Sequence, residues 1–207
     1  VADLFGAYSD HVISIGLTPN RSDAMSHLGV ARDVCNWLNH HEGTALKPIF
    51  KLNNEISKVD KPCAIEVIIE NTADCQRYAG AHIHDVEVKD APKWIQQRLK
   101  AIGQRPINNI VDITNYILHD TGQPLHAFDA DKIKGGVVRI KNLEEGTKFV
   151  SLDEKERKLS AGDLMICDAE SSPMCLGGIF GGVNSGVSIH TKNIFLESAW
   201  FHPVAIR

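Results

Sequence analysis

Two side chains stand out for the chemistry that they could do. His126 lies in a Gly-Gln-Pro-Leu-His stretch, where a rigid loop could let the imidazole hold or polarise a water molecule. Glu197 lies inside an apolar run, where a carboxylate must be hydrogen-bonded or reach a cavity. Each has a plainer interpretation: a lone histidine is more often a surface or satisfied buried residue, and an acid at a strand end can point to water.

The densest glycine segment is Gly-Gly-Ile-Phe-Gly-Gly at 177–182, followed by Asn-Ser-Gly at 184–186. It lacks the Gly-Lys-Ser/Thr of a phosphate-binding loop and the spacing of a dinucleotide-binding motif, so it gives little support to nucleotide binding. Glycine permits close approach of the backbone to a ligand. On composition alone, a tight turn between two core strands is the favoured interpretation.

Other candidate residues have open interpretations. Arg105 is either a positioned hydrogen-bond donor or an ordinary cation at a helix start. A metal hydrolase using His82, His84 and His126 is a weaker alternative, because no carboxylate or cysteine ligand lies at suitable spacing. No Gly-X-Ser-X-Gly motif is present and no cysteine has an evident base beside it, which disfavours covalent catalysis.

Composition limits the class of protein. The 207 residues include 22 Lys and Arg against 26 Asp and Glu, a net charge of −4, which excludes a strongly basic nucleic-acid coat. No apolar run approaches the ~18 residues of a membrane helix, and no secretory signal is present. Five cysteines without a C-x-x-C pair fit a reducing compartment. We therefore expect a cytoplasmic protein without membrane contact, and the first and last residues suggest a fragment of a longer chain.

The apolar spacing predicts three helices that would position these residues. They are 22–40 with Ser22 as N-cap and Gly43 beyond its end, 90–103 capped by Asp90, and 107–119 followed by Gly122. Extended segments are predicted at 63–70, 77–88, 137–141, 148–152, 164–168 and 194–198, with a polar connection at 44–62. Helices and strands do not alternate strictly, which favours an α+β fold.

Four blocks of sequence are informative when they are taken together and in order. They are Leu-Thr-Pro-Asn-Arg-Ser-Asp at 17–23, Arg-Pro-Ile-Asn-Asn-Ile-Val-Asp-Ile-Thr-Asn-Tyr at 105–116, Gly-Gln-Pro-Leu-His-Ala-Phe-Asp at 122–129 and the glycines at 177–182. Together they resemble the β subunit of bacterial phenylalanyl-tRNA synthetase, in particular its central editing module, the third and fourth domains. The resemblance implies mixed or antiparallel sheets with packed helices. It also implies that 1–21 end a preceding domain or linker and that 22–207 form the editing module, truncated at its C-terminal end.

In that family the module hydrolyses the ester of tyrosine mistakenly attached to tRNA(Phe). A hydrophobic pocket rejects an isostere with one added hydroxyl only about 100-fold, so a second site must select for the hydroxyl. The resemblance assigns catalytic roles to His126 and Asn115, and substrate-binding roles to Glu197, which receives the phenol, and to Arg105 and Gly181. The family also uses a threonine and a small residue downstream of the glutamate, in a segment that this chain lacks.

The resemblance further implies the partners and cofactors. The partners are the 3′ end of tRNA(Phe) carrying tyrosine and the α subunit of the parent heterotetramer. ATP and Mg²⁺ belong to the synthetic site of the parent enzyme, and neither a cofactor nor a metal is expected in this segment. The alternative function is a non-catalytic module of the same synthetase that positions RNA or supports subunit assembly.

Overall fold

The computed structural model describes residues 10–50 and 63–207, and the chain separates into two units. The helical unit consists of Val1–Lys58 and Asp90–Pro124, and the sheet unit consists of Val59–Lys89 and Leu125–Arg207. The chain therefore leaves the sheet unit part-way, contributes a segment to the helical unit, and returns.

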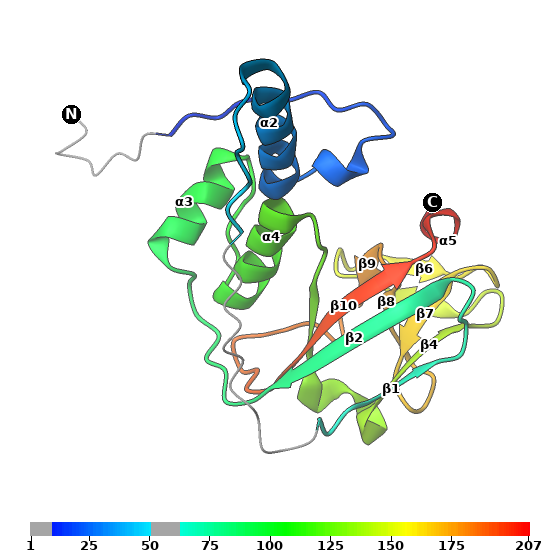
Figure 1. Ribbon diagram of the computed structural model, residues 1–207. Coiled ribbons are helices and arrows are strands. Elements are labelled where there is room, and N and C mark those ends of the chain that lie inside the picture. Colours follow the sequence, from blue (N-terminus) through cyan, green and yellow to red (C-terminus); the bar gives the residue numbers. More distant parts are fainter. Residues whose placement is uncertain (1–9, 51–62) are drawn as a thin grey trace. The chain divides into compact units, whose positions relative to one another are not determined.

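The helical unit is built around a small apolar cluster. Its elements are η1 (Ser22–Ala24), α2 (His27–Glu42), α3 (Lys93–Ala101) and α4 (Asn109–Thr121). α4 packs against both α2 and α3 (Figure 1). Ala91, Ile95 and Leu99 form the buried cluster, and Tyr116 packs against it. The apolar spacing that predicts a helix at 90–103 thus places Ile95 and Leu99 in the core, whereas Ile102 of the same pattern is 38% exposed.

Side-chain caps fix the starts of two helices. Ser26 Oγ accepts a hydrogen bond of 3.0 Å from the backbone nitrogen of Gly29 and begins α2. The prediction of Ser22 as the cap is wrong, because Ser22 enters the short η1 turn instead. Asn108 Oδ1 accepts a hydrogen bond of 3.0 Å from the backbone nitrogen of Val111 and begins α4.

Two of the helix ends follow the prediction. α2 and α4 end at Gly43 and Gly122, whose φ angles of 63° and 83° lie in the left-handed region that glycine adopts without strain. The predicted cap of α3 at Asp90 is wrong, because α3 begins after Pro92 and has no side-chain cap.

The sheet unit contains three sheets. Its strands are β1 (Glu66–Ile69), β2 (Cys75–Ile83), β3 (His126–Asp129), β4 (Val137–Asn142), β5 (Lys148–Val150), β6 (Glu156–Lys158), β7 (Leu164–Cys167), β8 (Pro173–Leu176), β9 (Phe180–Gly181) and β10 (Ile194–Phe201). The short helices η2 (Ala130–Lys132) and η3 (Lys134–Gly136) follow β3, and α5 (Pro203–Ile206) follows β10.

The strands pair in both directions. The five-stranded sheet has the order β1-β4-β7-β8-β9, in which β1 and β4 are parallel and the other neighbours are antiparallel. The antiparallel three-stranded sheet has the order β2-β10-β3, and β5 and β6 form a separate hairpin (Figure 1). Helices combined with a mixed sheet and an antiparallel sheet confirm the α+β prediction.

One apolar cluster joins the two larger sheets. Phe128 and Phe195 enter it from the three-stranded sheet, and Val138, Ile140 and Ile166 enter it from the five-stranded sheet. All five side chains are fully buried. The face of β10 that carries Phe195 therefore looks into the core rather than toward water.

Several strand predictions need correction. β2 ends at Ile83, before the predicted end at residue 88, and β3 begins at His126, where a loop is predicted. β6, β8 and β9 lie outside every predicted strand. Residues 51–62 of the predicted connection lie outside the described part of the chain. Among residues 10–50 and 63–207, no helix combines the length and the apolar character needed to cross a membrane.

Candidate functional site

Glu197 lies on the central strand of the three-stranded sheet and faces the core. It stands opposite Gly80 of β2 and His126 of β3. Its side chain is only 6% exposed, and its Oε2 accepts a hydrogen bond of 2.8 Å from the hydroxyl of Tyr78. Burial raises the pKa of Glu197 to about 7, and the hydrogen bond from Tyr78 opposes that rise. The acid predicted from an apolar run is therefore buried and hydrogen-bonded.

His126 shares the sheet face of Glu197, because directly opposed residues of neighbouring strands point the same way. Its ring meets the ring of Phe128 edge to face at 4.5 Å between centroids. Burial lowers the pKa of His126 to about 4, so the imidazole is neutral at pH 7. Among the described residues its ring nitrogens have no hydrogen-bond partner, so they are available to a water molecule or an ester.

Gly181 of β9 borders the same imidazole. A Cβ built at Gly181 would come within 3.0 Å of His126 Cε1 and 2.8 Å of Leu152 Cδ1. A side chain at this position would push on the ring, so the glycine leaves His126 its place. The predicted turn between two strands is also confirmed, because 177–179 connect β8 to β9. The glycine segment is thus both a turn and one wall of the site.

Gly80 has a similar role on the other neighbour of β10. A Cβ at Gly80 would overlap the ring of Phe195, which leans over the strand at this point. An apolar ring therefore lies beside the carboxylate of Glu197, two residues further along β10. An acceptor set among aromatic rings suits a ligand that is aromatic and carries one hydroxyl.

The other two predicted site residues belong to the helical unit. Asn115 lies half-buried in α4, and Arg105 lies exposed in the loop between α3 and α4. Asp112 helps to fix this loop, because its Oδ1 accepts a hydrogen bond of 2.8 Å from the backbone nitrogen of Ile107. The structure therefore brings together His126, Gly181 and Glu197 in one unit and places Arg105 and Asn115 in the other.

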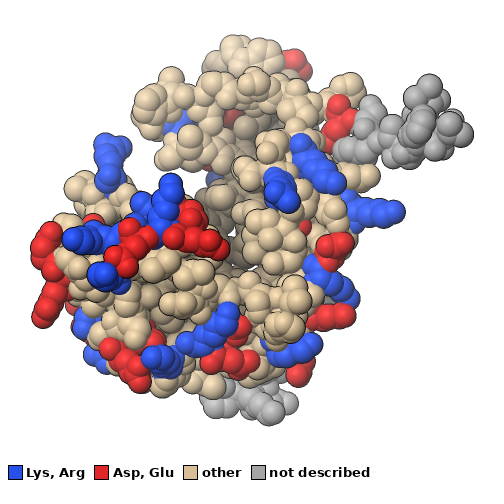
Figure 2. All heavy atoms as spheres, turned by 180° about the vertical axis from the view of Figure 1, so that it is seen from behind, with Lys and Arg blue, Asp and Glu red and all other residues tan. Residues whose placement is uncertain are grey.

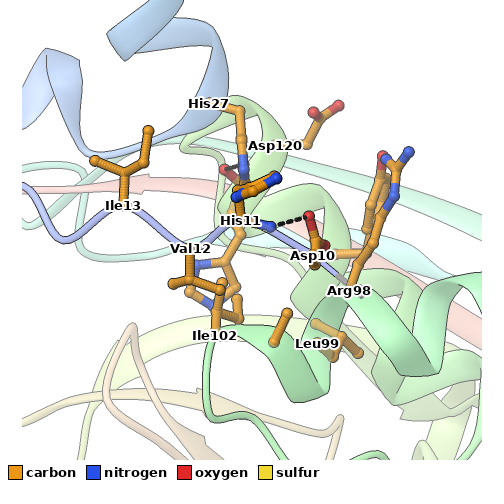
Figure 3. Close-up of a pocket in the computed structure, with 12 residues that line it drawn as sticks. Asp10, His11, Val12, Ile13, His27, Arg98, Leu99, Ile102 and Asp120 are labelled. Carbon is orange, nitrogen blue, oxygen red and sulfur yellow. Dashed lines mark hydrogen bonds between the residues drawn. The ribbon is translucent and has the colours of Figure 1, made fainter. Parts of the chain in front are cut away.

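A cavity of about 430 Å³ lies in the helical unit, and none of the five predicted residues lines it. Figure 3 shows the polar groups around it. His27 Nδ1 lies 3.0 Å from the backbone oxygen of His119. Arg98 donates a hydrogen bond of 2.9 Å to the hydroxyl of Tyr116. His27 and Arg98 are therefore already hydrogen-bonded within the helical unit.

His82, in β2, and His84, just after the end of β2, have neighbouring rings that are tilted by 39°. The rings of His82 and His84 lie 3.9 Å apart between centroids. Both nitrogens of His82 are enclosed without a hydrogen-bond partner among the described residues, and burial lowers its pKa. Over the described ranges, no group of three or more His, Cys, Asp or Glu side chains is arranged to hold a metal ion.

Tyr78 is the residue of this site that the sequence did not reveal. It lies 119 residues from its partner Glu197, and a single tyrosine in a strand carries no motif. The alternating pattern of the extended segment was the one available signal, because it places Tyr78 and Gly80 on the same face of β2.

Surface charges of the sheet unit pair with one another. Arg139 and Lys141 lie 2.6 and 3.6 Å from Glu70, and Arg157 lies 3.0 Å from Asp153. Basic and acidic side chains are intermixed over the face that Figure 2 shows. Paired charges leave little excess positive field for a phosphate backbone, in agreement with the net charge of the chain.

Comparisons with known proteins identify the family of the chain. Residues 74–207 match the B3/4 domain family. The chain is 50% identical over 210 residues to the phenylalanine–tRNA ligase beta subunit of Bacteroides thetaiotaomicron, covering 99% of this chain and 25% of that protein. It is 50% identical over 206 residues to the subunit of the same name from Porphyromonas gingivalis, covering 100% of this chain and 25% of that protein.

A solved structure shares the fold. It is an N-terminal fragment of the phenylalanyl-tRNA synthetase beta subunit from Pyrococcus horikoshii, with a TM-score of 0.50 and 18% identity, covering 90% of this chain and 55% of that chain. The chain spans about a quarter of the length of the bacterial relatives. Its sequence and its fold show that the chain belongs to the B3/4 domain family and corresponds to one segment of the phenylalanine–tRNA ligase beta subunits that it resembles.

Proposed function

We propose that this chain is the editing module of a phenylalanyl-tRNA synthetase and hydrolyses the ester of tyrosine mistakenly attached to tRNA(Phe). The observation that carries the proposal is the buried carboxylate of Glu197, set opposite a neutral His126 and beside aromatic side chains. An acid that only forms an ion pair at the surface does not need to be buried in the core.

Glu197 selects the amino acid in this proposal. Its free oxygen accepts a hydrogen bond from the phenol of the bound tyrosine. Phenylalanine has no hydroxyl and would leave the second oxygen of the buried carboxylate without a donor, which costs about 1–3 kcal/mol. The difference removes tyrosine and spares phenylalanine.

His126 holds the attacking water. A neutral imidazole nitrogen accepts a hydrogen bond from water and orients its oxygen toward the ester carbonyl. The water oxygen forms a bond to the carbonyl carbon, the bond from that carbon to the ribose oxygen breaks, and the ribose oxygen takes up the proton that the water loses. Orientation and polar stabilisation supply most of the rate, because no nucleophilic side chain takes part.

The remaining roles rest on the resemblance. The resemblance assigns a catalytic role to Asn115 and a substrate-binding role to Arg105. The 3′ end of tRNA(Phe) and the α subunit are the proposed partners. The hydrolysis draws on no cofactor in this segment, since ATP and Mg²⁺ serve the synthesis of the aminoacyl ester by the complete enzyme.

The test measures release of amino acid from Tyr-tRNA(Phe) and Phe-tRNA(Phe) by the complete synthetase. We expect the unaltered enzyme to hydrolyse Tyr-tRNA(Phe) preferentially, Glu197→Gln to lose about tenfold or more of that preference, and His126→Ala to lose rate on the tyrosine ester. Glu144→Gln and His190→Ala change exposed residues of the same unit and serve as matched controls.

Each result decides between two functions. Hydrolysis of Tyr-tRNA(Phe) that falls in both site variants and persists in both controls supports editing. If the unaltered synthetase releases tyrosine no faster than buffer does, editing is rejected, and a role in positioning RNA or in subunit assembly takes its place.

A further inference from the structure

The carboxylate of Glu197 has one oxygen held and one oxygen free. Oε2 accepts the hydroxyl of Tyr78 at 2.8 Å, whereas Oε1 accepts no hydrogen bond from the described residues. A carboxylate offers about four lone-pair positions on its two oxygens. Among the described residues, the fully buried side-chain nitrogen and oxygen atoms without a hydrogen-bond partner belong to His82 and Asp112. Oε1 of Glu197 is not one of them, so this oxygen is accessible at the surface of the core.

The strand register sets Tyr78 in reach of this carboxylate. Tyr78 lies two residues before Gly80, which stands opposite Glu197, so both side chains project from the same sheet face. The missing side chain at Gly80 lets the ring of Phe195 lean across the strand. The phenol therefore approaches Glu197 diagonally, along a face with no intervening side chain from β2.

We propose that Tyr78 is the positioning residue of the tyrosine-reading site: its hydroxyl fixes Oε2 of Glu197, so that Oε1 is presented as an ionised acceptor to the hydroxyl of the bound amino acid. This inference rests on the function proposed above. Tyr78 does not touch the ester. It acts through Glu197, by setting the direction and the charge of the group that reads the substrate.

The titration of Glu197 can be distinguished from the titration of the ionisable groups around it. The ionisable side chains that share its face or interact with it are Tyr78, Cys75 and His82 of β2, His126 of β3 and Cys175 of β8. Burial raises the pKa of Cys75 to about 11 and the pKa values of Tyr78 and Cys175 well above their usual range. Burial lowers the pKa of both histidines. Within this set, Glu197 is the group that changes charge near pH 7.

Loss of the Tyr78 hydroxyl has a defined consequence. Without this donor, the buried carboxylate keeps its proton to higher pH. A protonated acid is a weaker acceptor for tyrosine and carries no charge to be left unpartnered by phenylalanine. The preference for tyrosine then falls at neutral pH and returns when the solution is made more alkaline.

The experiment compares the complete synthetase with its Tyr78→Phe variant and with Tyr116→Phe, a matched loss of one tyrosine hydroxyl in the helical unit. The measured quantity is the ratio of kcat/KM for Tyr-tRNA(Phe) to kcat/KM for Phe-tRNA(Phe) between pH 6 and 9. The ester and the α-amino group are common to both substrates, so their own pH dependence cancels. Transfer of phenylalanine to tRNA(Phe) by the same preparations checks that each variant is folded.

We expect the ratio of the unaltered enzyme to rise with pH through a midpoint near pH 7. In Tyr78→Phe the ratio at pH 7 falls about tenfold and the midpoint moves up by about one pH unit, whereas Tyr116→Phe changes neither. A Tyr78→Phe enzyme with the ratio and midpoint of the unaltered enzyme overturns the role of Tyr78 but leaves editing intact. If the unaltered enzyme does not hydrolyse Tyr-tRNA(Phe), the proposed editing function itself is rejected.

A second variant keeps the inference testable if Tyr78→Phe fails to fold. Site-specific 3,5-difluorotyrosine at position 78 keeps the ring and the hydroxyl, and its more acidic phenol is a stronger donor to Oε2. We expect the midpoint to move down in this enzyme, opposite to the shift in Tyr78→Phe. A midpoint that stays in place overturns the proposal.

Discussion

At the scale of single residues, Glu197 and His126 give the stability of the sheet unit opposite dependences on pH. The pKa of Glu197 rises from 4.5 in the unfolded chain to about 7 in the fold. Between these values the folded state holds a proton that the unfolded state has lost, so stability falls as pH rises. The pKa of His126 falls from 6.5 to about 4, so between these values stability rises with pH.

Substitution of Glu197 separates its effect on stability from that of His126. In Glu197→Gln the carboxylate is gone, while the amide oxygen still accepts from Tyr78. We expect the variant to match the unaltered chain at pH 4.5 and to be more stable at pH 8 by on the order of 3 kcal/mol. Urea unfolding across this pH range measures the difference. Glu144→Gln is the control, and a Glu197→Gln chain that is less stable at pH 8 contradicts a buried, charged Glu197.

The sequence identified single residues where chemistry and context conflict. An acid within an apolar run predicted that Glu197 needs a partner, and the structure supplies Tyr78. The sequence could not identify Tyr78 as this partner, because the contact follows from the pairing of β2 with β10 and from no local pattern. The neutral state of His126 was equally hidden, since it comes from burial beside Phe128 and Gly181.

At the scale of elements, caps decide where helices begin. Ser26 accepts from Gly29 at the start of α2, whereas Ser22 has no such bond. We therefore expect Ser26→Ala to lower the free energy of unfolding of the helical unit by about 1 kcal/mol. Ser22→Ala, four residues earlier in the same chain, is expected to cost well under half as much. Thermal unfolding followed by helical circular dichroism checks both, and equal losses would contradict the assignment of the cap.

Two helix ends and most of β10 were predictable from the sequence, whereas β3, β6, β8 and β9 were not. Gly43 and Gly122 mark their helix ends because their left-handed backbone favours glycine. A long apolar run in the sequence predicts the strand β10. β9 contains two residues and β6 three, which is too short for any alternation to emerge. The sequence predicts a loop where β3 lies, because the glycine and proline before His126 are turn signals and the strand itself has only four residues.

At the scale of the whole molecule, the apolar core is unevenly shared. The sheet unit holds two buried clusters, one of which joins both of its larger sheets. Among its described residues, the helical unit holds a cluster of three, Ala91, Ile95 and Leu99. Burial of apolar surface is the main source of stability in folded proteins. The two units therefore differ in their resistance to opening.

Amide hydrogen exchange measures this difference directly. We expect amides of β4, β7 and β10 to exchange at least tenfold more slowly than those of α2 and α3, because opening the strands exposes the larger core. Both sets are read in the same sample, so pH and temperature affect them alike. Helix amides that outlast the central strands would show that the small cluster understates the stability of the helical unit.

The central place of β10 also bears on how the protein is made. β2 and β3 pair with β10 and not with each other, and Glu197 follows Tyr78 by 119 residues. A nascent chain leaving the ribosome therefore carries Tyr78 and His126 long before the strand that unites them. Until β10 emerges, the two flanking strands have no common neighbour and the hydroxyl of Tyr78 has no acceptor in Glu197. The side chains of Tyr78, His126 and Glu197 therefore come together only after β10 has been made and has paired with both flanking strands.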